Sequence, residues 1–217
     1  MFRNIVIERE YGSGAGVIAR KLSERLGWKL WDKAFTEELA KAAHVTAPDI
    51  EECSEKRDKP LYRLAKVFFR GSFETSVHLG RSGPLDSDMV MEYAREISAR
   101  IAEGGDAIIV GRGAAYTLRK RRDTFRVFLF APRAEKLRRL LADGQSHDAA
   151  EHALDTVDEE RIEFVRHYFN KEWPYRPLYH LMINTSAGDE LVMDTMLDSM
   201  HRIEEAKASE NDVATPK

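Results

Sequence analysis

Short apolar runs and helical apolar patterns follow one another along this chain. The first 26 residues contain one complete unit of this kind. Ile5, Val6 and Ile7 form an apolar β-branched run, glycines interrupt the sequence at positions 12, 14 and 16, and apolar residues then recur at helical spacing up to Leu26. This pattern predicts a buried strand, a glycine-rich turn and an amphipathic helix in direct succession.

Four further apolar runs predict strands, at residues 28–31, 106–111, 125–130 and 179–184. The main helical patterns cover residues 33–43, 84–104, 133–141, 158–173 and 188–205. Alternating strands and helices favour a parallel sheet with right-handed crossovers, and the uninterrupted apolar run at 106–111 is typical of a strand covered by helices on both faces. We therefore predict an α/β fold that forms a single domain over residues 1–206.

Two segments and a tail depart from this alternation. Residues 44–83 are polar, charged helical stretches, which we interpret as a helical insertion over the sheet edge that forms an acceptor-binding flap. Residues 156–175 contain an aromatic-rich helix with Arg161, Arg166 and Lys171. This segment predicts either an arm that closes over a phosphate chain or a partly exposed core helix with solvated basic residues. Residues 207–217 lack apolar content and predict a disordered tail.

The glycine-rich turn has the composition of a phosphate-binding loop. It holds four small residues, Gly12, Ser13, Gly14 and Gly16. Such residues let backbone N–H groups turn inward, and the N-terminus of the next helix adds its positive dipole end. If Gly14 is the second glycine of the P-loop pattern, Arg9 stands at the first glycine and Ala15 at the lysine. The turn therefore predicts anion binding, with a tight βα turn that needs small residues for packing as the alternative.

Charged residues stand where predicted strands end. Asp32 follows the strand at 28–31 and Arg112 follows the strand at 106–111. Open α/β folds place ligands at the carboxyl ends of their strands, and a buried arginine there needs an anionic partner. The alternatives are an N-cap role for Asp32 and a structural salt bridge for Arg112. Arg133, after the strand at 125–130, is expected either near a bound base or as an ordinary surface arginine.

Composition narrows the classes of partner. The formal net charge is only -3, which disfavours nucleic acid as the main partner. The basic run at 119–122 is interpreted as a solvated helix end, with nucleic-acid or phosphate binding as the alternative. His167 and His180 lack the spacing of a metal site, so we predict no metal held by the protein alone.

The single cysteine and the start of the chain indicate a reducing compartment. Cys53 cannot form an internal disulfide, and the acidic residues around it disfavour a catalytic thiol. Glu8 and Glu10 stand where a signal peptide would be apolar, and no apolar run approaches about 20 residues. We therefore expect a cytoplasmic protein that has no membrane partner.

In their order along the chain, these segments resemble the cytidylate kinase-like family, a branch of the P-loop nucleoside monophosphate kinases. The resemblance rests on REYGSG at 9–14, the helix VIARKLSERLGW, LWD ending at Asp32, IIVGR ending at Arg112, FRVFLFAP, DEERIEFVRHYF with KEW after it, and INTS at 183–186. No single piece is diagnostic, but the ordered combination is specific. The resemblance covers most of the chain. It does not include the tail, and it is weak in the insertion at 44–83.

The resemblance implies a three-layer P-loop kinase-like fold with a parallel sheet of about five strands. It implies ATP as the phosphoryl donor, CMP or a related monophosphate as the acceptor, and Mg²⁺ bridging the donor phosphates. The residues that would wrap the donor phosphates are Gly12, Ser13, Gly14, Ala15, Gly16 and Val17. Asp32 and Arg112 would face the acceptor, and the positive groups of Arg161, Arg166 and Lys171 would carry the catalysis.

The chain departs from the family pattern in two places. Ala15 replaces the P-loop lysine, and Lys21 lies too deep along the helix to substitute for it, so Arg9 or Lys171 is the expected substitute. Gly113 stands where true cytidylate kinases carry an aspartate, so the resemblance does not extend to the residue at this position.

We therefore expect a phosphotransferase that moves a phosphoryl group from ATP to a nucleoside monophosphate, with reduced or altered catalysis. The alternative is a protein that binds a nucleotide or another anion and regulates a partner without turnover. Nucleic-acid binding through residues 119–122 and the aromatic arm is the least favoured function. The sequence leaves the oligomeric state open.

Overall fold

The computed structural model describes residues 1–43 and 87–213. The first part contains β1 (Asn4–Arg9), α1 (Ala15–Leu26), β2 (Lys29–Trp31) and α2 (Lys33–Ala43). The second part contains α5 (Ser87–Gly104), β3 (Ala107–Val110), α6 (Ala114–Thr117), β4 (Thr124–Phe130), α7 (Arg133–Ala142), α8 (His147–Phe169), η1 (Arg176–Leu178), β5 (Leu181–Asn184), η2 (Thr185–Ala187) and α9 (Asp189–Val213). The predicted insertion at 44–83 lies outside the described residues.

The described strands form one parallel sheet in the order β2-β3-β1-β4-β5. β1 lies between β3 and β4, so Ile5 stands opposite both Ile108 and Phe125. Every residue of β1 and β3 is buried, as expected for strands that helices cover on both faces. The predicted α/β fold with a parallel sheet of about five strands is confirmed.

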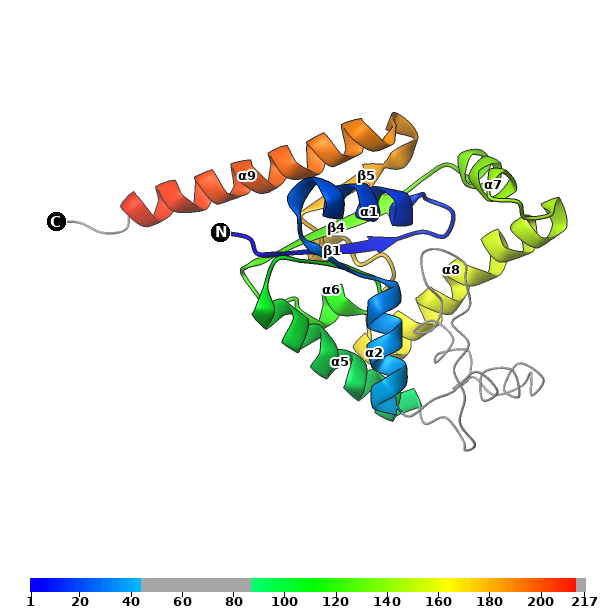
Figure 1. The fold of residues 1–217 in the computed structure, drawn as a ribbon, viewed down its shortest axis with the longest axis horizontal. Helices are drawn as coiled ribbons and strands as arrows, with labels where there is room; N and C mark the ends of the chain where they lie inside the picture. The colour runs from blue at the N-terminus through cyan, green and yellow to red at the C-terminus, as the bar shows by residue number, and fades with distance from the viewer. Residues whose placement is uncertain (44–86, 214–217) are drawn as a thin grey trace.

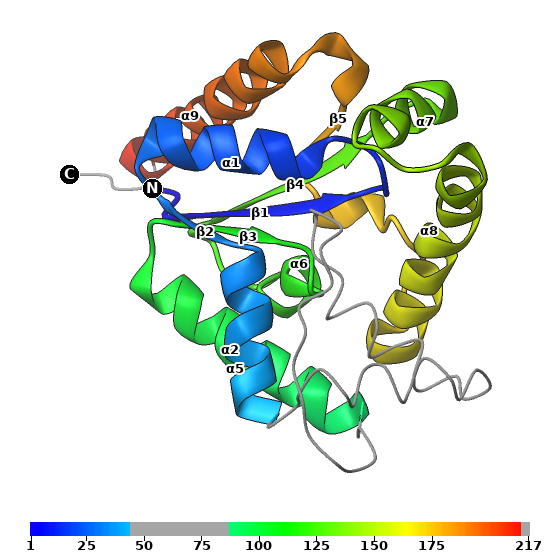
Figure 2. The same ribbon diagram turned by 45° about the vertical axis from the view of Figure 1, so that its right-hand side comes forward.

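Helices cover the two faces of the sheet in separate groups. Figures 1 and 2 show α1 and α9 on one face and α2, α5 and α6 on the other. Alternate residues of β1 enter the two cores: Ile5 and Ile7 pack with α1 and α9, whereas Val6 packs with α2 and α5. The sheet is therefore the middle layer of three.

α7 and α8 lie beyond the carboxyl ends of the central strands (Figure 2). A third apolar cluster joins them to the turn after β1, with Tyr11 packed against Leu140 of α7 and Leu154 of α8. These two helices therefore stand at the edge of the sheet where the sequence predicts the site.

The structure differs from the sequence expectations in two helices. α8 begins at His147 and runs without interruption to Phe169, and its residues Phe164 and Val165 are buried in the core. The segment expected as a closing arm at 156–175 is thus largely part of a long packed helix. α9 continues to Val213, so the helix includes residues 207–213, where the sequence predicts a disordered tail.

Candidate functional site

The turn between β1 and α1 requires glycine at two positions. Gly12 and Gly14 have φ angles of 70° and 77°, in the left-handed region that glycine adopts most easily. A Cβ atom on Gly12 would lie 3.0 Å from the Cβ of Lys136, and one on Gly14 would lie 3.0 Å from Nη1 of Arg139. Backbone conformation therefore favours glycine at both positions, and the close approach of α7 leaves little room for a Cβ atom.

The same turn presents hydrogen-bond donors that an anion could use. Gly14 is the N-cap residue of α1, and no side-chain cap bond is made there. The first N–H groups of a helix need acceptors from outside it. Next to them, the Ser13 side chain is buried, and its Oγ has no hydrogen-bond partner among the described residues. An oxyanion would accept from both kinds of donor.

α8 holds the beginning of this turn through Asp158. The backbone N–H of Tyr11 donates to both oxygens of the Asp158 carboxylate, at 2.9 and 3.2 Å. Nη1 of Arg161 donates to Asp158 Oδ1 at 2.7 Å and to the carbonyl oxygen of Arg9 at 2.9 Å. Lys136 Nζ lies 3.8 Å from Asp158 Oδ2. Arg161 thus reaches the end of β1 and is buried there, with 8% of its surface exposed.

Three guanidinium groups are buried together beside the turn. They belong to Arg9, Arg112 and Arg161, and the carboxylates of Glu8 and Asp32 are buried with them. Burial and the neighbouring charge of Arg161 lower the pKa of Arg9 to about 9, and burial lowers the pKa of Arg112 to about 10. Burial also raises the pKa of Glu8 above its usual value. Burial therefore makes these charges costly, and an anionic ligand beside the arginines would offset part of that cost.

Arg112 is held by the ends of two neighbouring elements. It follows β3, and its φ of 62° lies in the left-handed region, between the positive φ angles of Gly111 and Gly113. Its Nη2 donates to Thr36 Oγ1 at 2.6 Å and lies 3.8 Å from Asp32 Oδ1. Thr36 belongs to the first turn of α2, directly after Asp32. The structure therefore brings the two predicted acceptor residues together and gives Arg112 an ion pair as well.

Not every residue predicted for the site joins this cluster. Arg166 is exposed on α8, and Lys171 is exposed with its Nζ 4.9 Å from the centroid of the Tyr175 ring. Arg133 forms an ion pair with Asp155 at 2.7 Å, as an ordinary surface arginine does. The described contacts thus place Arg161, and not Arg166 or Lys171, beside Arg9 and Arg112.

Several residues at the site are not predicted from the sequence. Glu8, Lys136, Arg139 and Asp158 all contact the turn or the charged cluster. The one local signal is the spacing of Lys136 and Arg139, which places both on one side of α7. Lys21 is held by Asp189 of α9, with 3.0 Å between Nζ and Oδ2, as expected for a residue deep along α1.

The glycine turn, the parallel sheet and the cluster at its carboxyl edge occur in one stretch that matches a known family. The model of the cytidylate kinase-like family matches residues 4–187. The chain belongs to the cytidylate kinase-like family. The resemblance carried by the sequence motifs is thereby confirmed. A comparison with curated protein sequences found no match.

Solved structures of the same fold include several kinases. An uncharacterized protein from Eubacterium ventriosum is 18% identical, with a TM-score of 0.60 over 90% of this chain and 96% of that chain. A gluconokinase from Sinorhizobium meliloti is 14% identical, with a TM-score of 0.53 over 95% and 96% of the two chains. A shikimate kinase from Acinetobacter baumannii in complex with shikimate is 18% identical, with a TM-score of 0.50 over 95% and 96%. At these identities the likenesses establish the P-loop kinase fold, and fold and family together support a kinase-like phosphotransferase.

The residues of this family member fit a polyphosphate better than a bare metal ion. No group of three His, Cys, Asp or Glu side chains that could hold a metal exists in residues 1–43 and 87–213. The donors of the turn and the three guanidinium groups, in contrast, suit phosphate oxygens. A divalent cation bound to the phosphates of a nucleotide would neutralise part of their charge.

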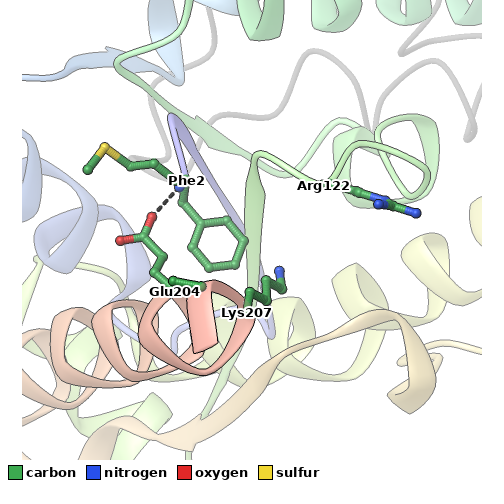
Figure 3. Close-up of a pocket in the computed structure, with 6 residues that line it drawn as sticks. Phe2, Arg122, Glu204 and Lys207 are labelled. Atoms are coloured by element: carbon green, nitrogen blue, oxygen red, sulfur yellow. Dashed lines mark hydrogen bonds between the residues drawn. The ribbon is translucent and has the colours of Figure 1, made fainter. Parts of the chain in front are cut away.

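Figure 3 shows a pocket at the opposite, amino edge of the sheet. Phe2 stands before β1, Arg122 stands before β4, and Glu204 and Lys207 lie on α9. The N–H of Phe2 donates to Glu204, and Lys207 Nζ lies 4.5 Å from the centroid of the Phe2 ring. None of the predicted catalytic, donor-binding or acceptor-binding residues lines this pocket.

In the described part of the chain, no helix is long and apolar enough to cross a bilayer.

Proposed function

We propose that this protein transfers a phosphoryl group from ATP to a nucleoside monophosphate, with CMP as the first acceptor to test. The observation that carries the proposal is the burial of Arg9, Arg112 and Arg161 at the carboxyl edge of the sheet, beside the glycine turn. Membership in the cytidylate kinase-like family supports the same activity. Phosphoryl transfer needs positioned positive charge more than covalent participation, and this cluster supplies such charge.

The proposed roles follow from the position of each group. The N–H groups of Gly12, Gly14, Ala15 and Gly16 bind the donor phosphates, with Mg²⁺ carried on those phosphates, whereas the N–H groups of Ser13 and Val17 already donate to backbone carbonyls. Arg112, oriented by Asp32 and Thr36, binds the acceptor phosphate, because a guanidinium can bind two oxygens at once. Arg161 stabilises charge on the transferring group, and Arg9, buried in the same cluster, is the candidate to replace the lysine absent at Ala15.

A protein that binds nucleotides without turnover is the second candidate. Ala15 favours it, because the usual P-loop lysine is absent. Catalytic roles for Arg166 and Lys171 are part of the proposal, although both side chains are exposed.

The deciding experiment measures ADP formation from Mg-ATP with a panel of nucleoside monophosphates, together with calorimetric binding of ATP. We expect turnover with at least one acceptor, and Arg161→Ala should lower kcat by about 100-fold or more. Arg112→Ala should mainly raise the KM for the acceptor. Arg166→Ala and Lys171→Ala in the same assay test the two exposed positions.

The matched control is Arg95→Ala, which removes an exposed arginine of α5 that pairs with Glu92. It should leave turnover and melting temperature unchanged. ATP binding without ADP formation for any acceptor, unaffected by Arg161→Ala, would establish the second candidate instead.

A further inference from the structure

The carbonyl group of Ser13 is held from two other segments of the chain. It accepts a hydrogen bond from Nη1 of Arg139 at 2.5 Å and one from Oγ1 of Thr185 at 2.6 Å. Arg139 belongs to α7, and Thr185 is the first residue after β5. The turn that follows β1 is thus fastened to the segments that follow β4 and β5.

Arg139 and Thr185 also fasten each other. Nη1 of Arg139 donates to Thr185 Oγ1 at 2.8 Å, and Nη2 donates to the Thr185 carbonyl oxygen at 3.0 Å. Nε of Arg139 lies 3.0 Å from Glu135 Oε1 of the same helix. Because every nitrogen of this guanidinium has a partner within the protein, Arg139 is placed to hold the backbone of the turn.

The orientation of the Ser13 carbonyl fixes the direction of one N–H group. A trans peptide is planar, so its C=O and N–H point in opposite directions. Holding the Ser13 oxygen toward Arg139 and Thr185 therefore directs the Gly14 N–H to the other side of the turn. Gly14 is the N-cap residue of α1, where donors for an anion are expected.

We propose that Arg139 and Thr185 are positioning residues, which aim the Gly14 N–H at the phosphate of the donor. The inference rests on the proposed function, because it needs a phosphate in the turn. It also gives a reason why the turn can work with Ala15 at the lysine position. A site that binds phosphate through backbone N–H groups depends on how rigidly those groups are held.

Two pairs of variants separate this role from general stability. Arg139→Ala is compared with Arg138→Ala, which removes the neighbouring exposed arginine that pairs with Glu135 but makes no described contact with the turn. Thr185→Val removes the hydroxyl with little change in shape, whereas Thr185→Ser keeps the hydroxyl. A conservative Arg139→Lys variant tests whether one positive donor is enough.

The first measurement is calorimetric binding of ADP and of inorganic pyrophosphate. We expect Arg139→Ala and Thr185→Val to weaken both by at least about tenfold, since each loses a short hydrogen bond to the turn. Arg138→Ala and Thr185→Ser should bind as the unmodified protein does. In turnover, the loss should appear in KM for ATP more than in kcat.

The second measurement is the amide NMR signal and hydrogen-exchange rate of Gly14 without ligand. Both should change in Arg139→Ala and Thr185→Val but not in the two controls. If the unmodified protein binds pyrophosphate and these variants bind it equally well, the positioning role is wrong while the proposed function stands. If the unmodified protein binds neither ligand, the proposed function fails, and an unchanged Gly14 signal in the variants would then overturn the positioning role as well.

Discussion

Glu8 shows how one side chain sets the electrostatics of the cluster. It lies on β1, and its carboxylate is buried among Arg9, Arg112 and Arg161, whose positive charges lower its pKa. Burial nevertheless dominates and raises its pKa. A carboxyl group whose pKa is higher in the folded state stabilises the fold below its unfolded value of 4.5, and that contribution is lost as the pH rises through the folded value.

The Glu8→Gln variant should therefore be more stable than the unmodified protein at pH 8. The neutral amide keeps the shape but avoids burying a charge. The advantage should shrink as the pH falls toward 4.5, and chemical denaturation at several pH values measures it. Glu92→Gln, at an exposed position of α5, is the control. Lower stability of Glu8→Gln at pH 8 would show instead that the ionised carboxylate is the main partner of the guanidinium groups.

At the scale of elements, α8 combines two tasks. Its apolar side, with Phe164 and Val165, is buried against the sheet, and its Asp158 and Arg161 hold the end of β1 and the turn after it. The burial of Phe164 and Val165 favours the alternative interpretation of this segment as a partly exposed core helix.

Asp158→Ala should lower the free energy of unfolding by about 1–3 kcal/mol, because the Tyr11 N–H and Arg161 both lose an acceptor. Asp158→Asn should cost less, since its amide oxygen still accepts from Tyr11. Asp155→Ala lies one turn earlier and removes only an exposed ion pair with Arg133, so it should cost at most about 1 kcal/mol. Urea denaturation compares the three variants. Equal losses of unfolding free energy in Asp158→Ala and Asp155→Ala would show that Asp158 does not hold the turn after β1.

At the scale of the whole molecule, strand order decides which residues meet. β1 lies between β3 and β4, and β2 lies beside β3, so the ends of the first three strands in the chain are adjacent. α7 and α8 then cover the same edge (Figure 2). A ligand at this edge would contact segments that are far apart in the chain and should stabilise the molecule as a unit.

Saturating Mg-ADP should therefore raise the melting temperature. A ligand that binds only the native state, at about 100 times its Kd, adds about 2.7 kcal/mol. For a chain of this size that corresponds to roughly 5–10 °C, measurable by differential scanning fluorimetry. Arg139→Ala should reduce the shift and Arg95→Ala should not. An absent shift in the unmodified protein at millimolar nucleotide would contradict nucleotide binding at this edge.

The sequence by itself determined the local elements, the glycine turn and the family. Apolar periodicity and glycine placement depend on neighbours within a few residues, so β1, α1 and the covered strands β3 and β4 could be predicted. The positions of Asp32 and Arg112 at strand ends followed for the same reason.

Only the tertiary structure decided which charged residues gather. Arg161 joins Arg9 and Arg112, whereas Arg166 on the same helix is exposed, and Arg139 holds a carbonyl group 126 positions away in the chain. Such contacts depend on strand order and on how α7 and α8 pack, which no local pattern encodes. Burial then sets the pKa values of Glu8, Arg9 and Arg112, because the cost of a charge depends on the whole surrounding volume.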